Sequence, residues 1–294
     1  MSALIAAIVL NTSLGIAFKL FPRYNVNTIY AIIFNYIACS VLGLIFYYDR
    51  FMSPIEIMHA PWFNYALFLG FIFVIGFYIS ARCVEHLGVA ITAMMQKISM
   101  VITVVYAVMI FAEPLGPYKV TGILTAVVAI ILVNYKGRRM ETLQKSSIII
   151  LLLPFGTFLI NGLIDTTMFH MKASGDNATD EGPFSTALFT IAAMVGMVWL
   201  FIRRFRQKIK IRKRDISAGF LLGIPNFFSI YTILLALNLD WGGSVIYPIF
   251  NIGVILLSAI IAIIVFREPL KLVNYIGLVL AAMAILLFSF SNAI

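Results

Sequence analysis

The stretch that decides the fold is Ile110-Phe111-Ala112-Glu113-Pro114-Leu115, which closes one long apolar run. It recurs 155 positions later as Val265-Phe266-Arg267-Glu268-Pro269-Leu270, at the end of another apolar run. The same offset pairs Gly122 with Gly277 in the runs that follow. Two distant segments that share a motif and its downstream glycine predict an internal repeat of about half the chain.

The composition around these motifs is that of a membrane protein. Of the 294 residues, 62% are hydrophobic and 11% are charged, whereas a soluble domain carries about 25% charged residues. About 20 apolar residues cross a bilayer core as a helix. The sequence therefore predicts an all-α integral membrane protein with ten transmembrane helices, at about 2–20, 27–48, 62–81, 87–111, 117–135, 147–171, 183–202, 216–237, 243–266 and 271–290.

The basic residues predict the orientation of these spans. Loops after odd-numbered spans carry 17 of the 21 Lys and Arg residues, and the other side carries three, namely Arg50, Lys119 and Lys172. Lys/Arg-rich loops face the cytoplasm, so we expect both termini outside and the loop 203–214 inside, in a plasma (inner) membrane. This clustering in short loops argues against nucleic acid as the partner of the net charge of +9. The basic loop itself either anchors the topology or binds anionic lipid headgroups.

Five spans per repeat is an odd number, so the two halves are expected to be inverted relative to one another. We predict a first five-helix repeat at 1–140 and a second, inverted repeat at 141–294. Inverted repeats are typical of secondary transporters, whose substrate site lies near the bilayer midplane where the halves meet.

On these features the chain resembles the drug/metabolite transporter superfamily, in particular its EamA-type ten-helix members. The resemblance rests on the 5+5 plan, the chain length, the Glu-Pro-Leu junctions and the glycines that follow them. It implies metabolite movement, often export, by alternating access through a central cavity lined mainly by helices one to four and six to nine. It also implies that helices five and ten lie at the periphery and form homodimer contacts in some members. Many such members are expected with the opposite orientation, so the predicted external termini depart from the family.

Lys97 is the sharpest candidate functional residue, because it lies near the middle of the fourth predicted span. A charged side chain there costs at least about 2.5–3.5 kcal/mol on insertion scales. Three alternatives are open: Lys97 holds an anionic substrate group, it forms a structural pair with Asp165, or it faces lipid. Asp165 is the one clear acid inside a predicted span, and it is the candidate proton or coupling site.

Polar side chains form stripes in the fourth and ninth spans, which are repeat equivalents. At the 155 offset Gln96 matches Asn251, and Thr92 matches Tyr247. Such groups line a cavity or act as interhelical hydrogen-bond glue. The full set of candidate substrate-binding residues is Lys97, Gln96, Asn251, Tyr247, Asn11, Asn35, Tyr78, Asn161 and Asn226.

Junction residues and helix breakers have simpler structural interpretations. Glu113 and Glu268 are each expected to cap the N-terminus of the next helix, with coupling-ion binding as the alternative. Gly70, with the prolines Pro154, Pro225 and Pro248, is expected to interrupt spans near the site. Gly219 and Gly223, four residues apart, are expected to allow close helix packing.

The predicted function is therefore a secondary transporter for a small organic metabolite, such as an amino acid or another carboxylate, and export is the expected direction. A channel or a lipid-linked carrier is the alternative. A membrane enzyme is less favoured, because the sequence contains no HExxH zinc motif, no Walker P-loop and no paired intramembrane aspartates. No cofactor or metal is expected, and Cys39 and Cys83 are expected to be small buried side chains.

Overall fold

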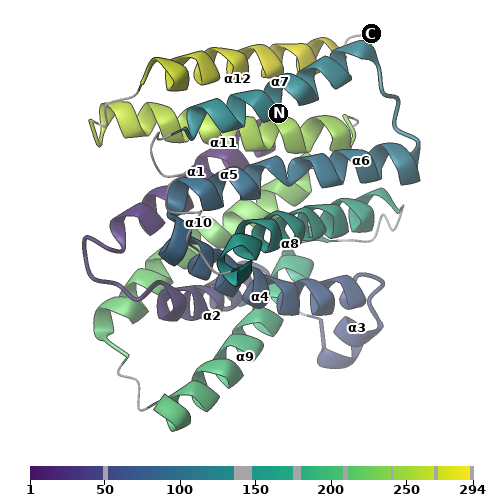
Figure 1. Ribbon diagram of the computed structural model, residues 1–294. Coiled ribbons are helices and arrows are strands. Elements are labelled where there is room, and N and C mark those ends of the chain that lie inside the picture. Colours follow the sequence, from purple (N-terminus) through teal and green to yellow (C-terminus); the bar gives the residue numbers. More distant parts are fainter. Residues whose placement is uncertain are drawn as a thin grey trace. The chain divides into compact units, whose positions relative to one another are not determined.

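The computed structural model describes residues 1–48, 52–135, 148–174, 180–207, 211–239, 241–267 and 271–291. In these ranges every regular element is a helix (Figure 1). The helices are α1 Ser2–Leu20, α2 Thr28–Phe46, α3 Pro54–His59, α4 Phe63–Leu87, α5 Val89–Ile98, α6 Met100–Phe111, α7 Pro117–Val133, α8 Ile148–Ala173, α9 Glu181–Gln207, α10 Lys213–Ala236, α11 Gly243–Ile264 and α12 Leu272–Ser291.

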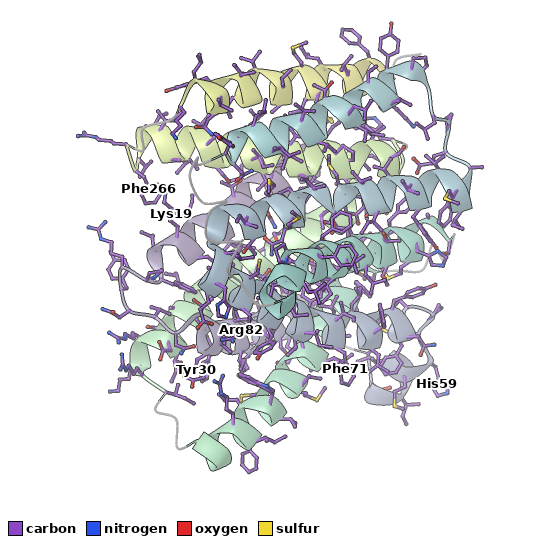
Figure 2. The ribbon with its side chains drawn as sticks, viewed as in Figure 1. Lys19, Tyr30, His59, Phe71, Arg82 and Phe266 are labelled. Atoms are coloured by element: carbon purple, nitrogen blue, oxygen red, sulfur yellow. The ribbon has the colours of Figure 1, made fainter. Side chains whose placement is uncertain are left out.

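These helices confirm the prediction of an all-helical, multi-pass membrane protein. Within the described residues, eight helical segments are long and apolar enough to cross a bilayer. Pro117–Val133 and Leu272–Phe288 are shorter apolar helices, and they lie at the fifth and tenth predicted spans. Many apolar side chains project from the helices, as Figure 2 shows for Phe71, which is 47% exposed. The count of ten spans stays a prediction.

The expected interruptions at prolines are wrong. The helices α8, α10 and α11 continue through Pro154, Pro225 and Pro248 respectively. The fourth predicted span is interrupted instead at Ser99, between α5 and α6. Neighbouring helices, side chains and local adjustments in membrane proteins can satisfy the carbonyl that a proline leaves without a partner.

The chain divides into two contact units, and each unit takes elements from both predicted repeats. The first comprises Met1–Tyr78 and His170–Asn238, and the second comprises Ile79–Phe169 and Leu239–Ile294. The predicted boundary near residue 140 concerns sequence repeats and stays a prediction.

In the first unit, α2 packs against both α9 and α10, and glycines make the close approach to α10 possible. A Cβ on Gly219 would overlap the Ala31 carbonyl oxygen, and one on Gly223 would lie 2.5 Å from the Ala38 Cβ. Real Cβ atoms do not approach other atoms so closely. The predicted packing role of these two glycines is therefore confirmed.

In the second unit, α7 and α12 lie side by side (Figure 1) and α11 packs against both helices as well as α6. A Cβ on Gly122 would lie 3.2 Å from the ring of Phe288, and one on Gly277 would lie 2.6 Å from the Val133 nitrogen. The Asn274 amide donates to the Leu132 carbonyl at 3.0 Å, and so it completes the C-terminus of α7. These contacts fix a tightly packed helix pair.

Candidate functional site

Lys97 lies in the last turn of α5, directly before the interruption at Ser99. The Ser99 hydroxyl donates to the Gln96 carbonyl at 2.5 Å. Such bonds from a side chain to the preceding turn often bend helices. The C-terminus of a helix carries partial negative charge. The local backbone therefore favours a cation at the position where the sequence places one.

Two side chains of the same unit interact with the Lys97 ammonium group. Its Nζ lies over the ring of Phe250 on α11, 5.2 Å from the ring centroid. This is the geometry of a cation–π interaction. The charge of Asp165 on α8 also acts on Lys97, but these two described residues form no direct ion pair, and both side chains are half-buried. Three helices thus contribute to one charged cluster inside the membrane spans.

Two buried polar groups on α11 stand on either side of Phe250 in the sequence. Tyr247 and Asn251 are one turn apart and only 1% and 2% exposed. Tyr247 interacts electrostatically with Asp165. Its Oη and the Asn251 Nδ2 are buried atoms without a hydrogen-bond partner. A buried donor without a partner costs about 1–3 kcal/mol, and the role of these two atoms in substrate binding stays a prediction.

The remaining predicted residues of this unit have partners within the protein. The Gln96 amide donates to Ser80 Oγ on α4 at 3.2 Å. The Asn161 amide donates to the Thr157 carbonyl of its own helix at 2.9 Å. Both side chains remain half-buried. Their role in substrate binding stays a prediction.

The first unit holds the other predicted residues. The buried amides of Asn226 and Asn35 meet at 3.2 Å in the tight contact between α10 and α2. The Cys39 thiol donates to the Gly223 carbonyl at 3.3 Å. These bonds agree with the interpretation that the polar residues hold neighbouring helices together. The buried Asn35 Nδ2 nevertheless has no hydrogen-bond partner. Asn11 lies half-buried on α1.

Tyr78 lines an apolar cavity of about 50 Å³ in the first unit, together with residues such as Tyr36, Phe77 and Trp199. The Tyr78 and Trp199 rings lie 6.3 Å apart. Small-molecule sites usually measure roughly 300–1,000 Å³. The cavity is therefore too small to hold a metabolite as it stands.

Glu113 caps a helix, but not the next one in the chain, and the expectation on this point is corrected. Its carboxylate accepts the backbone N–H groups of Gly243 at 2.8 Å and Ser244 at 3.0 Å, in the first turn of α11. It also accepts the Ser244 hydroxyl, which in turn accepts from Lys119 at 3.1 Å. The next helix, α7, begins with Pro117, which lacks an N–H to cap. Glu268 lies outside the described residues.

Sequence reasoning missed Phe250 and Ser80, because an aromatic ring or a lone serine in an apolar span carries no pattern of its own. The segment that Glu113 caps, by contrast, does have a recognisable sequence pattern. Gly242-Gly243-Ser244 stands directly before an apolar run, which is a typical helix start. That signal could have identified the segment that a distant carboxylate caps.

A family model matches the N-terminal part of the chain. Residues 1–135 match the EamA-like transporter family, which confirms the predicted resemblance. An uncharacterized protein of Haemophilus influenzae is 25% identical over 295 residues, which cover 97% of this chain and 96% of that protein. A solved crystal structure of a protein superposes with a TM-score of 0.77 at 12% identity, over 98% of this chain and 95% of that chain. At that identity the likeness shows the fold alone.

Proposed function

We propose that this chain, whose residues 1–135 match the EamA-like transporter family, is a secondary transporter of a small organic metabolite that bears a carboxylate, such as an amino acid. It works by alternating access in the plasma (inner) membrane, in the direction of export. One observation carries the proposal: Lys97 and Asp165 lie in membrane spans of the same contact unit that holds the buried, unpartnered Tyr247 Oη and Asn251 Nδ2.

The chemistry of this cluster supports a carboxylate as the bound group. Lys97 supplies positive charge, and Tyr247 and Asn251 supply two neutral donors. Ionisable residues in membrane spans mark substrate or ion pathways. A structural Lys97–Asp165 pair alone would explain the charges, but it leaves the two buried donors on α11 unexplained.

Backbone features support the proposed two-repeat architecture. Ala112 and Arg267, 155 positions apart, both adopt left-handed conformations, with φ of 52° and 50°. Gly88 and Gly242, the N-caps of α5 and α11, also share a positive φ, at positions 154 apart and so within one residue of the repeat offset. A residue other than glycine rarely adopts such a backbone conformation, so its recurrence at Ala112 and Arg267 favours duplicated halves. We therefore retain ten spans and two inverted repeats, 1–140 and 141–294, as the proposed architecture.

The proposed orientation has both termini outside and the loop 203–214 in the cytoplasm, and it rests on the basic-residue asymmetry. Labelling single-cysteine variants in this loop with an impermeant thiol reagent tests it, after Cys39 and Cys83 have been replaced. Labelling is expected only once the membrane is permeabilised. Labelling of intact cells would reverse the orientation.

Transport itself is tested with purified protein in liposomes and pooled metabolites. A carrier gives saturable flux with counterflow. Ohmic current without saturation would favour a channel instead, and chemical turnover of a metabolite would indicate an enzyme. Flux of a lipid-linked compound would identify the lipid-linked carrier.

The Lys97→Met variant tests the site. It should lose most of the saturable flux, because the cation that attracts the carboxylate is gone. Glu85→Gln is the matched control, since Glu85 is an exposed partner of Arg82 at the end of α4. Unchanged affinity and flux in Lys97→Met would remove Lys97 from the site.

A further inference from the structure

We infer that the cavity in the first unit, lined by α2, α4 and α9, holds part of an acyl chain of an anionic phospholipid, and that Arg203 binds the phosphate group of the same lipid. This lipid is bound in addition to any solute that the protein carries. The inference goes beyond the proposed transport function and does not depend on which solute is transported.

The cavity has the chemistry of hydrocarbon. Among the described residues, its lining consists of isoleucine, valine and aromatic side chains, such as Ile33 on α2, Val74 on α4 and Trp199 on α9. An acyl chain is narrow and can lie partly in the cavity while the bilayer surrounds the rest of it. The small volume that excludes a whole metabolite therefore does not exclude a lipid chain.

The helix α9 also exposes apolar side chains beside this cavity. Val198 and Ile202, which lie one residue before and three residues after Trp199, are 60% and 49% exposed. Tyr78, which lines the cavity from α4, is 46% exposed. Exposed apolar surface of this kind marks contact with a membrane or a partner, and this part of α9 lies in a candidate membrane span. Lipid chains are therefore the molecules at hand to enter the cavity.

A cation lies at the end of the cavity. The Arg203 guanidinium lies over the Trp199 ring, 5.0 Å from its centroid, in the geometry of a cation–π interaction. The Trp199 ring lies 6.3 Å from the ring of Tyr78. Arg203 also ends the apolar span Glu181–Arg203, which is the level expected for lipid headgroups. Stacking uses the face of the guanidinium, whereas phosphate binding uses the N–H groups at its edge, so the two interactions are compatible.

The start of α10 lies close to the same end of the cavity. Ile211 packs against a buried cluster that contains Ile33 and has Trp199 at its edge, and both of these residues line the cavity. The Asp215 carboxylate accepts the N–H of Asn27, the N-cap of α2, at 2.8 Å. These two contacts hold residues 211–215 beside the helices that form the cavity.

This segment adds positive charge and a buried donor. It contains Arg212, Lys213 and Arg214, and the Arg214 Nε is a buried atom without a hydrogen-bond partner. The one acid of the segment, Asp215, already accepts the backbone N–H groups of Asn27 and Arg212. The segment therefore favours an anion, and phosphate is the anion that a phospholipid supplies. Basic clusters at the cytoplasmic end of membrane helices bind anionic lipids, and the proposed orientation places this end in the cytoplasm.

Quenching of Trp199 fluorescence by brominated lipids tests the site. The chain has three tryptophans, and Trp62→Phe with Trp241→Phe leaves Trp199 alone. This single-tryptophan protein is titrated in detergent with lipids whose acyl chains carry bromine, which quenches at contact. Half-maximal quenching should require about five-fold less brominated phosphatidylglycerol than brominated phosphatidylcholine, the preference expected from one basic side chain near the headgroups.

Variants of the single-tryptophan protein separate the roles of headgroup and chain. Arg203→Gln should require equal amounts of the two lipids. Val74→Phe should weaken quenching by both, because the larger side chain fills the cavity. Lys271→Gln, which removes an exposed cation of the second unit, is the matched control and should keep the preference. Size-exclusion chromatography and thermal melting confirm folding, and the Arg203→Gln result stands even if Val74→Phe does not fold.

Inorganic phosphate distinguishes a lipid site from a site for a free anion. Unbrominated phosphatidylglycerol should restore the Trp199 emission, and sodium phosphate should restore no more than sodium chloride of the same ionic strength. Three outcomes would overturn the inference: phosphate displaces the brominated lipid, the two brominated lipids quench the single-tryptophan protein alike, or Arg203→Gln keeps the preference. Saturable flux in liposomes tests transport separately, so failure of either proposal leaves the other standing.

Discussion

Glu113, at the junction after α6, accepts three hydrogen bonds from the start of α11. Its two carboxylate oxygens accept from two backbone amides and one hydroxyl at the start of α11. Negative charge at a helix N-terminus also interacts favourably with the helix dipole. The buried Lys119 extends this network through Ser244. One side chain at the end of α6 thus fixes where α11 begins.

Replacing Glu113 by Ala should lower the free energy of unfolding by about 0.5–2 kcal/mol, the range for loss of a helix N-cap. The melting temperature of the purified protein in detergent measures the change. Glu85→Ala, which removes an exposed carboxylate from the end of α4, should change it little. Equal melting temperatures for the two variants would contradict the capping role.

Sequence reasoning could single out residues whose chemistry is unusual for an apolar span. It could not single out residues whose importance depends only on which side chains they contact in the folded protein. An ionisable group in an apolar span singled out Lys97 and Asp165, and both residues lie in the same contact unit, while their role in a site stays a prediction. Phe250 carries no such signal, since aromatic side chains are common throughout this chain. Asn35 and Asn226 stood out as polar groups, but only the packed structure shows that they bond to each other.

At the scale of elements, length and hydropathy placed the long helices, because about 20 apolar residues form one crossing. They could not place the interruption at Ser99, since no proline or glycine marks it. The short helix α3 was missed although its signal is present. Ser53 and Glu56 form a capping box, in which the Ser53 N–H donates to Glu56 Oε2 at 2.6 Å.

Helix α3 should depend on pH through this box. The Ser53 N–H bond to the carboxylate lowers the pKa of Glu56 below its ordinary value. A lowered folded-state pKa stabilises α3 above the ordinary carboxyl pKa, and this contribution is lost as the pH falls through the lowered value. Amide exchange of residues 53–59, corrected for intrinsic rates, should therefore accelerate in acid. Glu56→Gln should not show this acceleration, and equal pH responses of the two proteins would refute the assignment.

The contact between α2 and α10 should not tolerate a methyl group. Gly219→Ala would press against the backbone of α2 at Ala31, and overpacking costs typically about 1–3 kcal/mol. Gly15→Ala is the matched control, because a Cβ there meets no atom within 4 Å. Melting temperatures should fall for Gly219→Ala and stay level or rise for Gly15→Ala, since alanine favours a helix. A similar shift in both variants would argue against close packing.

At the scale of the whole molecule, the sequence predicted the class correctly, since its composition leaves no soluble alternative. The grouping of contacts into two units was not predictable, because each unit draws on both halves of the chain. A sequence repeat shows which helices of the two halves are equivalent, whereas contacts show which helices touch. The helices α7 and α12 are both equivalent in the predicted repeats and in contact with each other.

This pair has a self-complementary contact. Gly122 faces Phe288 and Gly277 faces Val133, and the 155 offset converts each contact into the other. Such an isologous surface binds its own counterpart and does not require a covalent connection. Residues 1–140 and 141–294, expressed as two separate chains, should therefore associate in the membrane and co-purify through a tag on one fragment. Gly277→Leu should abolish co-purification, and association that survives this change would place the recognition elsewhere.

The self-complementary contact between α7 and α12 affects how the chain folds during synthesis. The α7 helix emerges from the ribosome long before α12, and until then its glycine surface has no partner within the chain. A second copy of α7 on a neighbouring polypeptide would offer a related surface during that interval. Correct folding therefore depends on the later half arriving before two early halves meet, so strong overexpression should favour misassembled dimers.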